Sequence, residues 1–263
     1  MSASPAIHTV QRANVLGVGV SAINLPKAVE LILEAVRTGR KGYIAVTGVH
    51  GVSEAQLDSD FRRILNNAFL NTPDGMPMSW VGRLQGFKTM DRVYGPDLML
   101  AVAAASSDTG VRHFLYGGVP GVADALKLSL QTRFPGMVIC GTFSPPFRPL
   151  NDQEAEELTQ SMAACKPDIC WVGLSTPKQE RFMEEYLSKL PVTLMIGVGA
   201  AFDMHTGRVK QAPFWMQRSG TEWFFRLMQE PRRLWRRYLI NNPLFVMRIV
   251  TQFAGIRTYS LDR

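Results

Sequence analysis

The sequence lacks any apolar run long enough to cross a bilayer, since a membrane-spanning helix needs about 18 or more consecutive apolar residues. Its opening residues, MSASPAIHTVQRAN, contain no basic stretch followed by an apolar one, so we expect no secretory signal. Cysteine is scarce, and Cys140, Cys165 and Cys170 are not spaced as a zinc site or a redox pair. These absences predict a cytoplasmic protein with reduced, mostly buried thiols.

Familiar nucleotide and metal motifs are missing as well. Neither GxGxxG nor a Walker sequence occurs, which argues against an NAD site and a nucleoside triphosphatase. No metal-ligand cluster or Ser–His–Asp motif is evident, and His50, His113 and His205 each stand alone. We therefore expect no cofactor and no metal ion.

The composition is that of a folded protein, with 46% hydrophobic and 19% charged residues. Charge is unevenly distributed: the net charge is +7, yet residues 208–263 alone hold eleven basic and three acidic side chains. The length of 263 residues fits one large domain with an appendage, at about 150 residues per domain. We predict an α/β catalytic domain over 1–207 and a basic, aromatic-rich helical appendage over 208–263.

Apolar segments with the length of buried strands alternate with amphipathic helical segments along the first 207 residues. This alternation predicts a mostly parallel sheet with helices on both faces. Ligands bind such sheets in the loops that follow the carboxyl ends of the strands. The expected strands cover residues 14–20, 43–47, 113–116, 137–141, 168–173 and 192–198, with a short apolar segment at 69–71.

Asp74 follows this short segment in the sequence TPDGMP. A carboxylate at the end of a strand can act as a general base on a hydroxyl group, or it can ligate a metal ion. Pro-Asp-Gly is equally an ordinary turn in which the aspartate binds its own backbone. The residues alone leave these alternatives open.

Three further loops place small or polar residues after strands. Glycines there allow close backbone approach, a following helix N-terminus can bind phosphate, and polar side chains can hold a sugar or a nucleotide. Turn chemistry, a solvated first helical turn and tight packing explain the same residues. The candidates are Tyr116, Gly117 and Gly118 after one strand, Lys178, Gln179 and Glu180 after the next, and Gly199 and Asp203 after the last.

Arg92, in the sequence DRVYGPD, can pair with a phosphate through two parallel hydrogen bonds. Asp91 or Asp97 can equally hold it in a structural salt bridge. The sequence does not decide between these roles.

Aromatic residues and arginines interleave over residues 212–250, which Pro213, Pro231 and Pro243 are expected to divide into short helices. Rings beside arginines suit the interface of a membrane that contains anionic lipid. The same composition suits nucleic-acid binding, or a structural or oligomeric role. We favour the membrane surface and do not expect nucleic acid as a partner.

Six motifs, in order from about Asn14 to Tyr238, resemble the WecG/TagA/CpsF family of bacterial glycosyltransferases: TPDGMPM, RVYGPDLM, YGG, STPKQE, VGAAFD and WMQRSGTEWFFRLMQEPRRLWRRYL. The resemblance implies a Rossmann-like α/β fold and inverting transfer of a hexose or N-acetylhexosamine from a UDP-sugar. It implies an acceptor sugar linked to polyprenyl diphosphate, in cell-surface or exopolysaccharide biosynthesis. The protein would then be peripheral on the cytoplasmic face of the plasma membrane.

The resemblance also implies roles for single residues. Asp74 matches the family's proposed catalytic base, Thr47 a threonine of the same pocket, and Arg92 an arginine that meets the acceptor's diphosphate. Gln179 and Asp203 match residues near the bound nucleotide-sugar. Basic residues of the tail are expected at the membrane or the acceptor, namely Arg226, Arg232, Arg233, Arg236 and Arg237.

His50 marks a departure from the family pattern, because members often have an asparagine close to the threonine where this chain reads Thr47-Gly-Val-His50. We count His50 among the substrate-binding residues, and the changed loop leaves the donor sugar open, with a glucose-type donor as one candidate. Two other function classes remain: a non-catalytic nucleotide-binding assembly protein, and a nucleic-acid-binding module that uses the basic tail. Association into a homo-oligomer is compatible with each.

Overall fold

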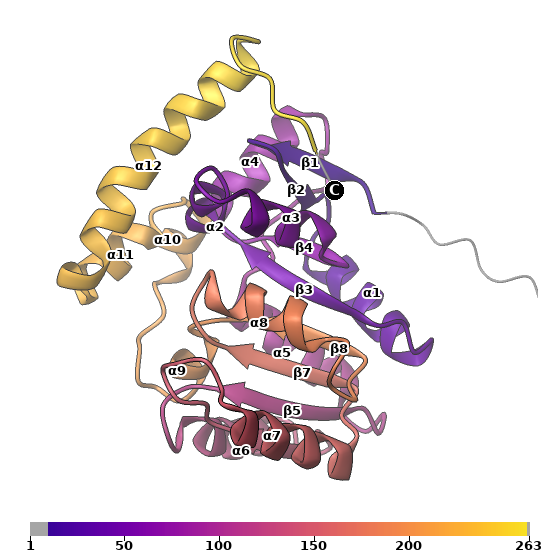
Figure 1. Cartoon of the computed structure of the whole chain (residues 1–263). Coiled ribbons are helices and arrows are strands. Elements are labelled where there is room, and N and C mark those ends of the chain that lie inside the picture. The colour runs from indigo at the N-terminus through magenta and orange to yellow at the C-terminus, as the bar shows by residue number, and fades with distance from the viewer. Residues whose placement is uncertain (1–9, 262–263) are drawn as a thin grey trace, which may run out of the picture.

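A six-stranded sheet forms the centre of the computed structural model, which describes residues 10–261 (Figure 1). The strand order is β4-β3-β8-β7-β5-β6, and every neighbouring pair is parallel. The predicted parallel sheet is therefore confirmed. The strands are β3 (Gly42–Thr47), β4 (Leu70–Pro73), β5 (Arg112–Gly117), β6 (Val138–Phe143), β7 (Ile169–Gly173) and β8 (Leu194–Gly197).

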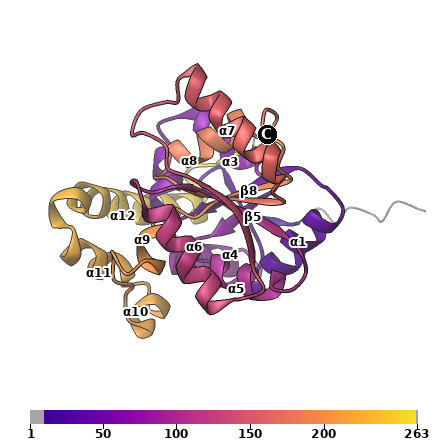
Figure 2. The ribbon, with the colours of Figure 1, turned by 90° about the horizontal axis from the view of Figure 1, so that it is seen from below.

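Helices cover both faces of this sheet, as predicted, because side chains alternate along the strands and feed two separate hydrophobic clusters. On β5, Phe114 and Tyr116 belong to one cluster and Leu115 to the other. Figure 2 shows α3, α7 and α8 on one side and α1, α5 and α6 on the other. The first cluster includes residues of α2 (Val49–Glu54), α3 (Ser59–Asn67), α4 (Met76–Leu84), α7 (Asp152–Cys165) and α8 (Lys178–Tyr186), and the second includes residues of α1 (Leu25–Arg37), α5 (Gly95–Ser106), α6 (Val122–Arg133) and α9 (Ala201–His205).

The expected strand over 14–20 is wrong, because the chain turns back within it. Strands β1 (Arg12–Val15) and β2 (Val18–Ser21) form a separate antiparallel hairpin. Its two-residue turn places Leu16 at φ 55° and Gly17 at φ 82°. Positive φ at both positions fits the twist of hairpin strands, and glycine adopts it without steric cost.

Short polar side chains mark where two of the helices begin. The Asp58 side chain accepts a hydrogen bond of 2.9 Å from the Phe61 N–H, so the segment 51–68 is divided into α2 and α3. Asn151 and Glu154 form a reciprocal capping box at the start of α7. At the other end of α7 the fold brings the free thiols of Cys140 and Cys165 to an Sγ–Sγ distance of 2.9 Å, a proximity that their sequence spacing did not show.

The C-terminal helices α10 (Phe214–Arg218), α11 (Glu222–Gln229) and α12 (Pro231–Phe253) follow the sheet domain. Pro243 lies inside α12, so the prediction that it divides the stretch is wrong. Proline removes one backbone N–H, which leaves the carbonyl of Leu239 without its helical partner. Leu239 is 55% exposed, so water can take the place of that donor and the helix continues.

Helix α12 is attached to the N-terminal hairpin, and Figure 1 shows it as a long yellow helix that runs from α11 to β1 and β2. The Gln252 side chain accepts a hydrogen bond of 3.0 Å from the Leu16 N–H and donates one of 2.8 Å to the Asn14 carbonyl. Phe245 is buried in the first hydrophobic cluster. Division of the chain into domains at residue 207 stays a prediction, since the two parts share these contacts.

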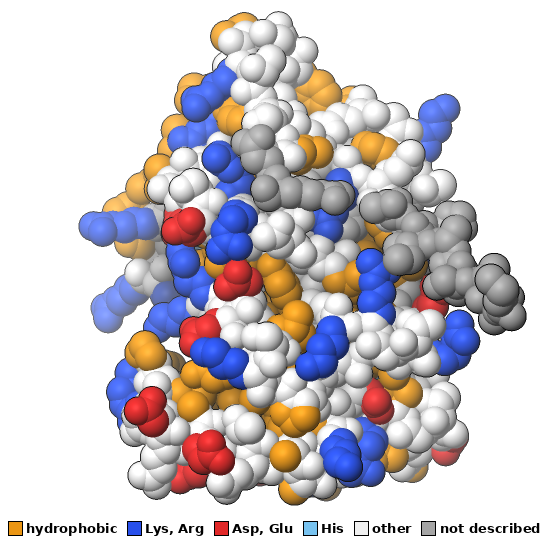
Figure 3. All heavy atoms as spheres, turned by 45° about the vertical axis from the view of Figure 1, so that its right-hand side comes forward, with side chains coloured by type: hydrophobic (Ala, Val, Ile, Leu, Met, Phe, Trp, Pro, Cys, Tyr) orange, Lys and Arg blue, Asp and Glu red, His pale blue; other side chains and the backbone are white. Residues whose placement is uncertain are grey.

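No helix within residues 10–261 has the length and apolar character needed to cross a bilayer. In Figure 3 lysine and arginine side chains crowd the left edge of the molecule, on the side where the C-terminal helices lie. Two segments of earlier predictions lie outside the described residues: 1–9, where no secretory signal is expected, and 262–263 of the basic tail.

We expect Gly117→Ala to lower the free energy of unfolding by about 2 kcal/mol or more. Gly117 has φ 139°, and a Cβ there would lie 2.5 Å from the Gly173 carbonyl oxygen. Gly110→Ala is the matched control, because Gly110 has φ 79° but nothing within 4 Å of its added Cβ. Urea unfolding followed by circular dichroism should show a clearly smaller loss for the control, and equal losses would contradict the close contact.

Candidate active site

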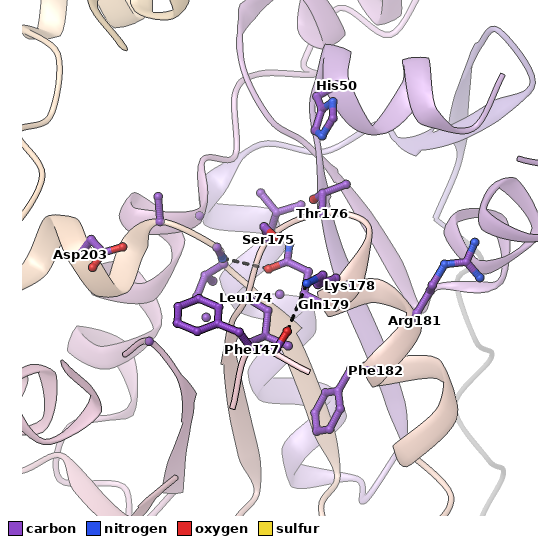
Figure 4. A pocket seen from close by; sticks show the side chains of 18 of the residues that line it. His50, Phe147, Leu174, Ser175, Thr176, Lys178, Gln179, Arg181, Phe182 and Asp203 are labelled. Carbon is purple, nitrogen blue, oxygen red and sulfur yellow. Dashed lines mark hydrogen bonds between the residues drawn. The ribbon is translucent and has the colours of Figure 1, made fainter. Parts of the chain in front are cut away.

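A cavity of about 1430 Å³ opens at the carboxyl ends of the parallel strands. Pockets for a single small ligand occupy about 300–1,000 Å³, so this one has room for two substrates side by side. The predicted loops meet there, as expected for an open α/β sheet. From those loops the cavity is lined by His50, Asp74, Tyr116, Gly118, Lys178, Gln179, Gly199 and Asp203, some of which Figure 4 labels.

Asp74 follows β4 directly and is held against the end of β3. Its N–H donates a hydrogen bond of 3.0 Å to the Thr47 carbonyl. A Cβ on Gly48 would lie 3.0 Å from the Asp74 carbonyl oxygen and 3.4 Å from its Oδ2, so glycine leaves the room that this approach needs. The half-buried carboxylate therefore faces the cavity from a fixed turn.

Burial raises the pKa of Asp74 to about 6. The nearby charges act in opposite directions, because Arg92, Arg226 and Arg237 lower this pKa while Glu222 raises it. A carboxylate of this kind loses its proton near neutral pH and is a stronger base than an ordinary aspartate. These are the properties of a general base.

Arg92 is engaged inside the protein rather than exposed in the cavity. Its guanidinium lies 2.7 Å from Glu222 Oε2 and 3.1 Å from Asp97 Oδ2, and it donates a hydrogen bond of 2.9 Å to Gln217 Oε1. It also lies over the ring of Tyr94, 3.9 Å from the centroid. The structure thus shows the salt bridge with Asp97, and a contact of Arg92 with a diphosphate stays a prediction.

Arginines of the C-terminal helices form a cationic wall of the cavity. Arg226, Arg233, Arg236 and Arg237 line it, whereas Arg232 does not. Burial lowers the pKa of Arg237, as expected for a cation held partly away from water. The tail therefore supplies the cavity with charge of the sign that a diphosphate needs.

The first turn of α8 contributes two side chains to the cavity and one behind it. Gln179 Oε1 accepts a hydrogen bond of 3.1 Å from the Gly199 N–H, which fixes the loop after β8. Lys178 Nζ lies 3.5 Å from the Phe147 carbonyl. Glu180 does not line the cavity; it accepts hydrogen bonds from Thr176 and Gln179, and burial raises its pKa.

The remaining predicted residues have mixed placements. Tyr116, Gly118 and Gly199 lie at the cavity, but Gly117 packs against Gly173 instead. Asp203 lines the cavity with Arg208, and 3.4 Å separates the Asp203 carboxylate from the Arg208 guanidinium. Neither His113 nor His205 lines the cavity; His113 bonds to Ser106 and Trp171, and His205 bonds to the Pro96 carbonyl.

His50 is a neutral side chain with one free ring nitrogen. Its burial, together with the Arg237 charge, lowers its pKa to about 4. Nδ1 is buried without a hydrogen-bond partner and lies 3.6 Å from a Glu54 oxygen. A neutral imidazole can donate to or accept from a sugar hydroxyl without bringing a charge.

Most buried side-chain polar atoms that lack a hydrogen-bond partner within residues 10–261 belong to residues in or beside this cavity. Each such group carries a desolvation cost of about 1–3 kcal/mol unless another molecule satisfies it. The clustering of these unpaired polar atoms at the cavity indicates a site for a polar ligand. The atoms are Thr47 Oγ1, His50 Nδ1, Arg92 Nε, Glu180 Oε2, Arg226 Nε and Arg237 Nε.

Sequence reasoning missed two parts of the site. Glu222 and Gln217 hold Arg92, and Phe147 lines the cavity from the proline-rich loop after β6. For the loop a signal existed, since an aromatic residue among prolines follows the carboxyl end of a strand. For Glu222 there was none, because its partner lies 130 residues earlier in the chain.

A model of the glycosyl transferase WecG/TagA/CpsF family matches residues 13–258. The chain belongs to this family. The resemblance seen in the six motifs is thus confirmed, and the protein is a glycosyltransferase.

Two curated relatives in the WecG/TagA/CpsF family carry the same name, N-acetylglucosaminyldiphosphoundecaprenol N-acetyl-beta-D-mannosaminyltransferase. The protein of Bacillus subtilis (strain 168) is 28% identical over 202 residues, which cover 77% of this chain and 76% of the relative. That of Bacillus spizizenii (strain ATCC 23059 / NRRL B-14472 / W23) is 31% identical over 211 residues, or 80% and 79% of the two chains.

No three His, Cys, Asp or Glu side chains gather as a metal site in the part of this WecG/TagA/CpsF family chain that the structure describes. The cations of the cavity are arginines and a lysine. That the protein works without a metal ion stays a prediction.

We expect Asp74→Asn to raise the free energy of unfolding at pH 8 by about 1–2 kcal/mol. The folded state holds the Asp74 proton more tightly than the unfolded chain, so the charged carboxylate costs stability above pH 6. This cost in stability fades as the pH falls toward 3.8, the ordinary pKa of an aspartate. The stability gained by Asp74→Asn should therefore nearly vanish at pH 4. Urea titrations at both pH values measure it; exposed Asp60→Asn should show no gain, and a gain independent of pH would contradict the shifted pKa.

Proposed function

We propose that this family member transfers a hexose or N-acetylhexosamine, with inversion, from a UDP-sugar to a sugar linked to polyprenyl diphosphate. The observation that carries the proposal is the position of Asp74: a half-buried carboxylate with a pKa of about 6 lines a cavity together with the arginines of the C-terminal helices. A base and an anion-binding wall are the two parts that such a transfer needs.

Asp74 accepts the proton of the acceptor hydroxyl in this mechanism. The hydroxyl oxygen forms a bond to the anomeric carbon from the face opposite the leaving group. The bond between that carbon and the diphosphate oxygen breaks, and UDP leaves with the electron pair. One displacement of this kind inverts the anomeric centre, and no covalent enzyme intermediate forms.

The arginines Arg226, Arg233, Arg236 and Arg237 offset the charge that develops on the departing diphosphate. The names of both relatives give their acceptor a diphosphate, and in the proposed reaction a lipid-linked acceptor of this kind brings a second diphosphate to the same cavity. Several arginines are therefore in keeping with two anionic substrates. We expect neither a metal ion nor a cofactor to take part.

The neutral side chain of His50 is positioned to bind a hydroxyl of the transferred sugar. With Thr47 it stands at the carboxyl end of β3, beside the proposed base. The relatives transfer N-acetylmannosamine by their names, and the His50 loop is where this chain is expected to differ. The donor sugar stays open, with a glucose-type donor among the candidates.

A row of exposed apolar side chains on α12 supports attachment to a membrane surface. The row consists of Trp235, Leu239, Val246, Val250 and Phe253, each 45–60% exposed. Their spacing of three, four or seven residues places them on one side of the helix. We propose that this apolar row, with Arg232 and Arg236 at its end, enters the headgroup layer of the cytoplasmic membrane face.

We expect Asp74→Asn to lower turnover about 10²–10⁴-fold while UDP still binds, because the variant loses the base but keeps the arginine wall. UDP release from a panel of UDP-sugars, with a short-chain polyprenyl-diphosphate sugar as acceptor, measures it. Asp60→Asn, at an exposed site, should turn over as the wild type does.

Near-normal turnover of Asp74→Asn would disprove the role of this residue. The wild type could bind UDP and yet release no UDP from any of the UDP-sugars tested. That result would favour the non-catalytic assembly protein. Salt-sensitive RNA or DNA binding without UDP binding would favour the nucleic-acid module.

The apolar row is a cleaner test of membrane attachment than the arginines, since four of the five tail arginines predicted to meet the membrane or the acceptor line the cavity. We expect replacement of Leu239, Val246 and Val250 by serine to reduce co-sedimentation with anionic liposomes several-fold. The matched control replaces three exposed leucines outside α12 by serine, namely Leu57, Leu84 and Leu128. Unchanged sedimentation of the row variant, or an equal loss in the control, would remove this part of the proposal.

A further inference from the structure

Two cysteines that the candidate site does not use lie in contact at the edge of the sheet. Cys140 is on β6 and Cys165 is the last residue of α7, and their Sγ atoms are 2.9 Å apart. Both thiols are free and partly exposed, and neither lines the cavity. The fold thus brings together two oxidisable groups that are 25 positions apart in the chain and within reach of small solutes.

A β-bulge sets the direction of the Cys140 side chain. His113 on β5 pairs with Ile139, but the next residue of β5, Phe114, pairs with Gly141. Cys140 is therefore an extra residue without a partner on β5, and an extra residue of this kind re-aims its side chain. The Cys140 side chain packs against the first hydrophobic cluster, on the face of the sheet that α7 covers.

The position of Cys165 is fixed by hydrogen bonds of the backbone around it. The Arg112 Nε–H donates a hydrogen bond of 2.7 Å to the Cys165 carbonyl. Lys166 ends the helix with φ 44°, and its N–H donates a hydrogen bond of 2.7 Å to the Met162 carbonyl. With both partners held in this way, the two thiols need only a small displacement to bond to each other.

The two elements that carry these thiols have few buried side chains. Strand β6 is the last in the strand order, and it has one buried residue, Ile139. Of the 14 residues of α7, which Figure 1 shows at the lower end of the molecule, two are buried, Leu158 and Met162. Elements with few buried apolar contacts open locally at low cost, and an uncovered edge strand can pair with another chain. A covalent link between α7 and β6 opposes both events.

We propose that Cys140 and Cys165 are a modification site, at which hydrogen peroxide oxidises the two thiols to a reversible disulfide that ties α7 to β6. Under reducing conditions the pair stays as two thiols, and the bond forms when peroxide accumulates. The inference does not depend on the proposed function, because neither thiol lines the cavity.

The reaction consumes one peroxide molecule and releases two water molecules. The Cys140 sulfur attacks one peroxide oxygen as a thiolate, the O–O bond breaks, and the other oxygen leaves as hydroxide, which takes up the thiol proton. The Cys165 sulfur then bonds to the Cys140 sulfur and displaces the hydroxyl group of this sulfenic acid, which leaves as water with the Cys165 proton. The two thiols lose two electrons, and the peroxide gains them.

Burial raises the pKa of Cys165, so this thiol stays protonated, and we assign the first attack to Cys140.

Peptide mapping of the oxidised wild type tests the assignment without any variant. The full chain is treated with hydrogen peroxide, its remaining thiols are alkylated in urea, and a protease that cuts before aspartate digests it. This cleavage places each cysteine on its own peptide, namely 124–151, 152–167 and 168–202. We expect the first two peptides to be linked with the loss of two hydrogen atoms, Cys170 to be alkylated, and dithiothreitol to release the link.

Urea unfolding measures the effect of the link on stability. We expect the oxidised wild type to unfold at a urea concentration about 1 M higher than the reduced protein, because the link restricts the unfolded chain. Peroxide should not raise the midpoint of Cys140→Ser, which lacks one partner of the pair. The matched control is Cys170→Ala, which removes a buried thiol of β7 outside the pair and should gain as the wild type does.

A link to the peptide of Cys170, a link between two chains, or oxidation to sulfinic acid without any link would overturn the inference. An oxidised wild type that unfolds at the same urea concentration as the reduced protein would overturn it too, and so would an equal gain in Cys140→Ser. A failure of the proposed sugar transfer is distinguishable from these results, because both measurements follow the thiols and the fold alone.

Discussion

The ion pair between Arg92 and Glu222 joins the two parts of the molecule that together form the candidate site. Arg92 Nη2 lies 2.7 Å from Glu222 Oε2, and both side chains are largely buried. Removing one partner of such a pair leaves an uncompensated buried charge, which destabilises strongly. The pair therefore holds α11 against the sheet domain, and with it Arg226 close to Asp74. Without this contact the cavity has a carboxylate but lacks part of its cationic wall.

The proton affinity of Asp74 is consequently a property of the assembled chain. Burial raises its pKa, but Glu222, Arg226 and Arg237 also act on it, and all three belong to the C-terminal helices. A change in the position of α11 or α12 alters the strength of the proposed base as well as the binding of anions. Substrate binding and proton transfer are thus coupled through the same few charges.

The parallel sheet was predictable because its strands are apolar on both faces and alternate with helices along the chain. Few other folds require this combination of features. Asp74, Gln179 and Asp203 were predictable as a group because carboxyl ends of parallel strands meet at one edge. The hairpin turn was missed because Leu16 adopts a positive φ that a non-glycine residue rarely takes. The engagement of Arg92 by Glu222 was not predictable, since a contact across 130 residues depends on the complete fold.

The hydrogen bond between the Leu16 N–H and the Gln252 side chain has a consequence for the way the protein is made. The two residues are 236 positions apart, so the ribosome completes the hairpin long before its partner exists. During that interval the Leu16 amide depends on water, whereas the Asn14 carbonyl can accept a hydrogen bond from the Gln85 side chain. Because α12 also carries Arg233, Arg236 and Arg237, the nascent chain has no complete cavity until this helix emerges. Completion of the candidate site is therefore among the last events of synthesis.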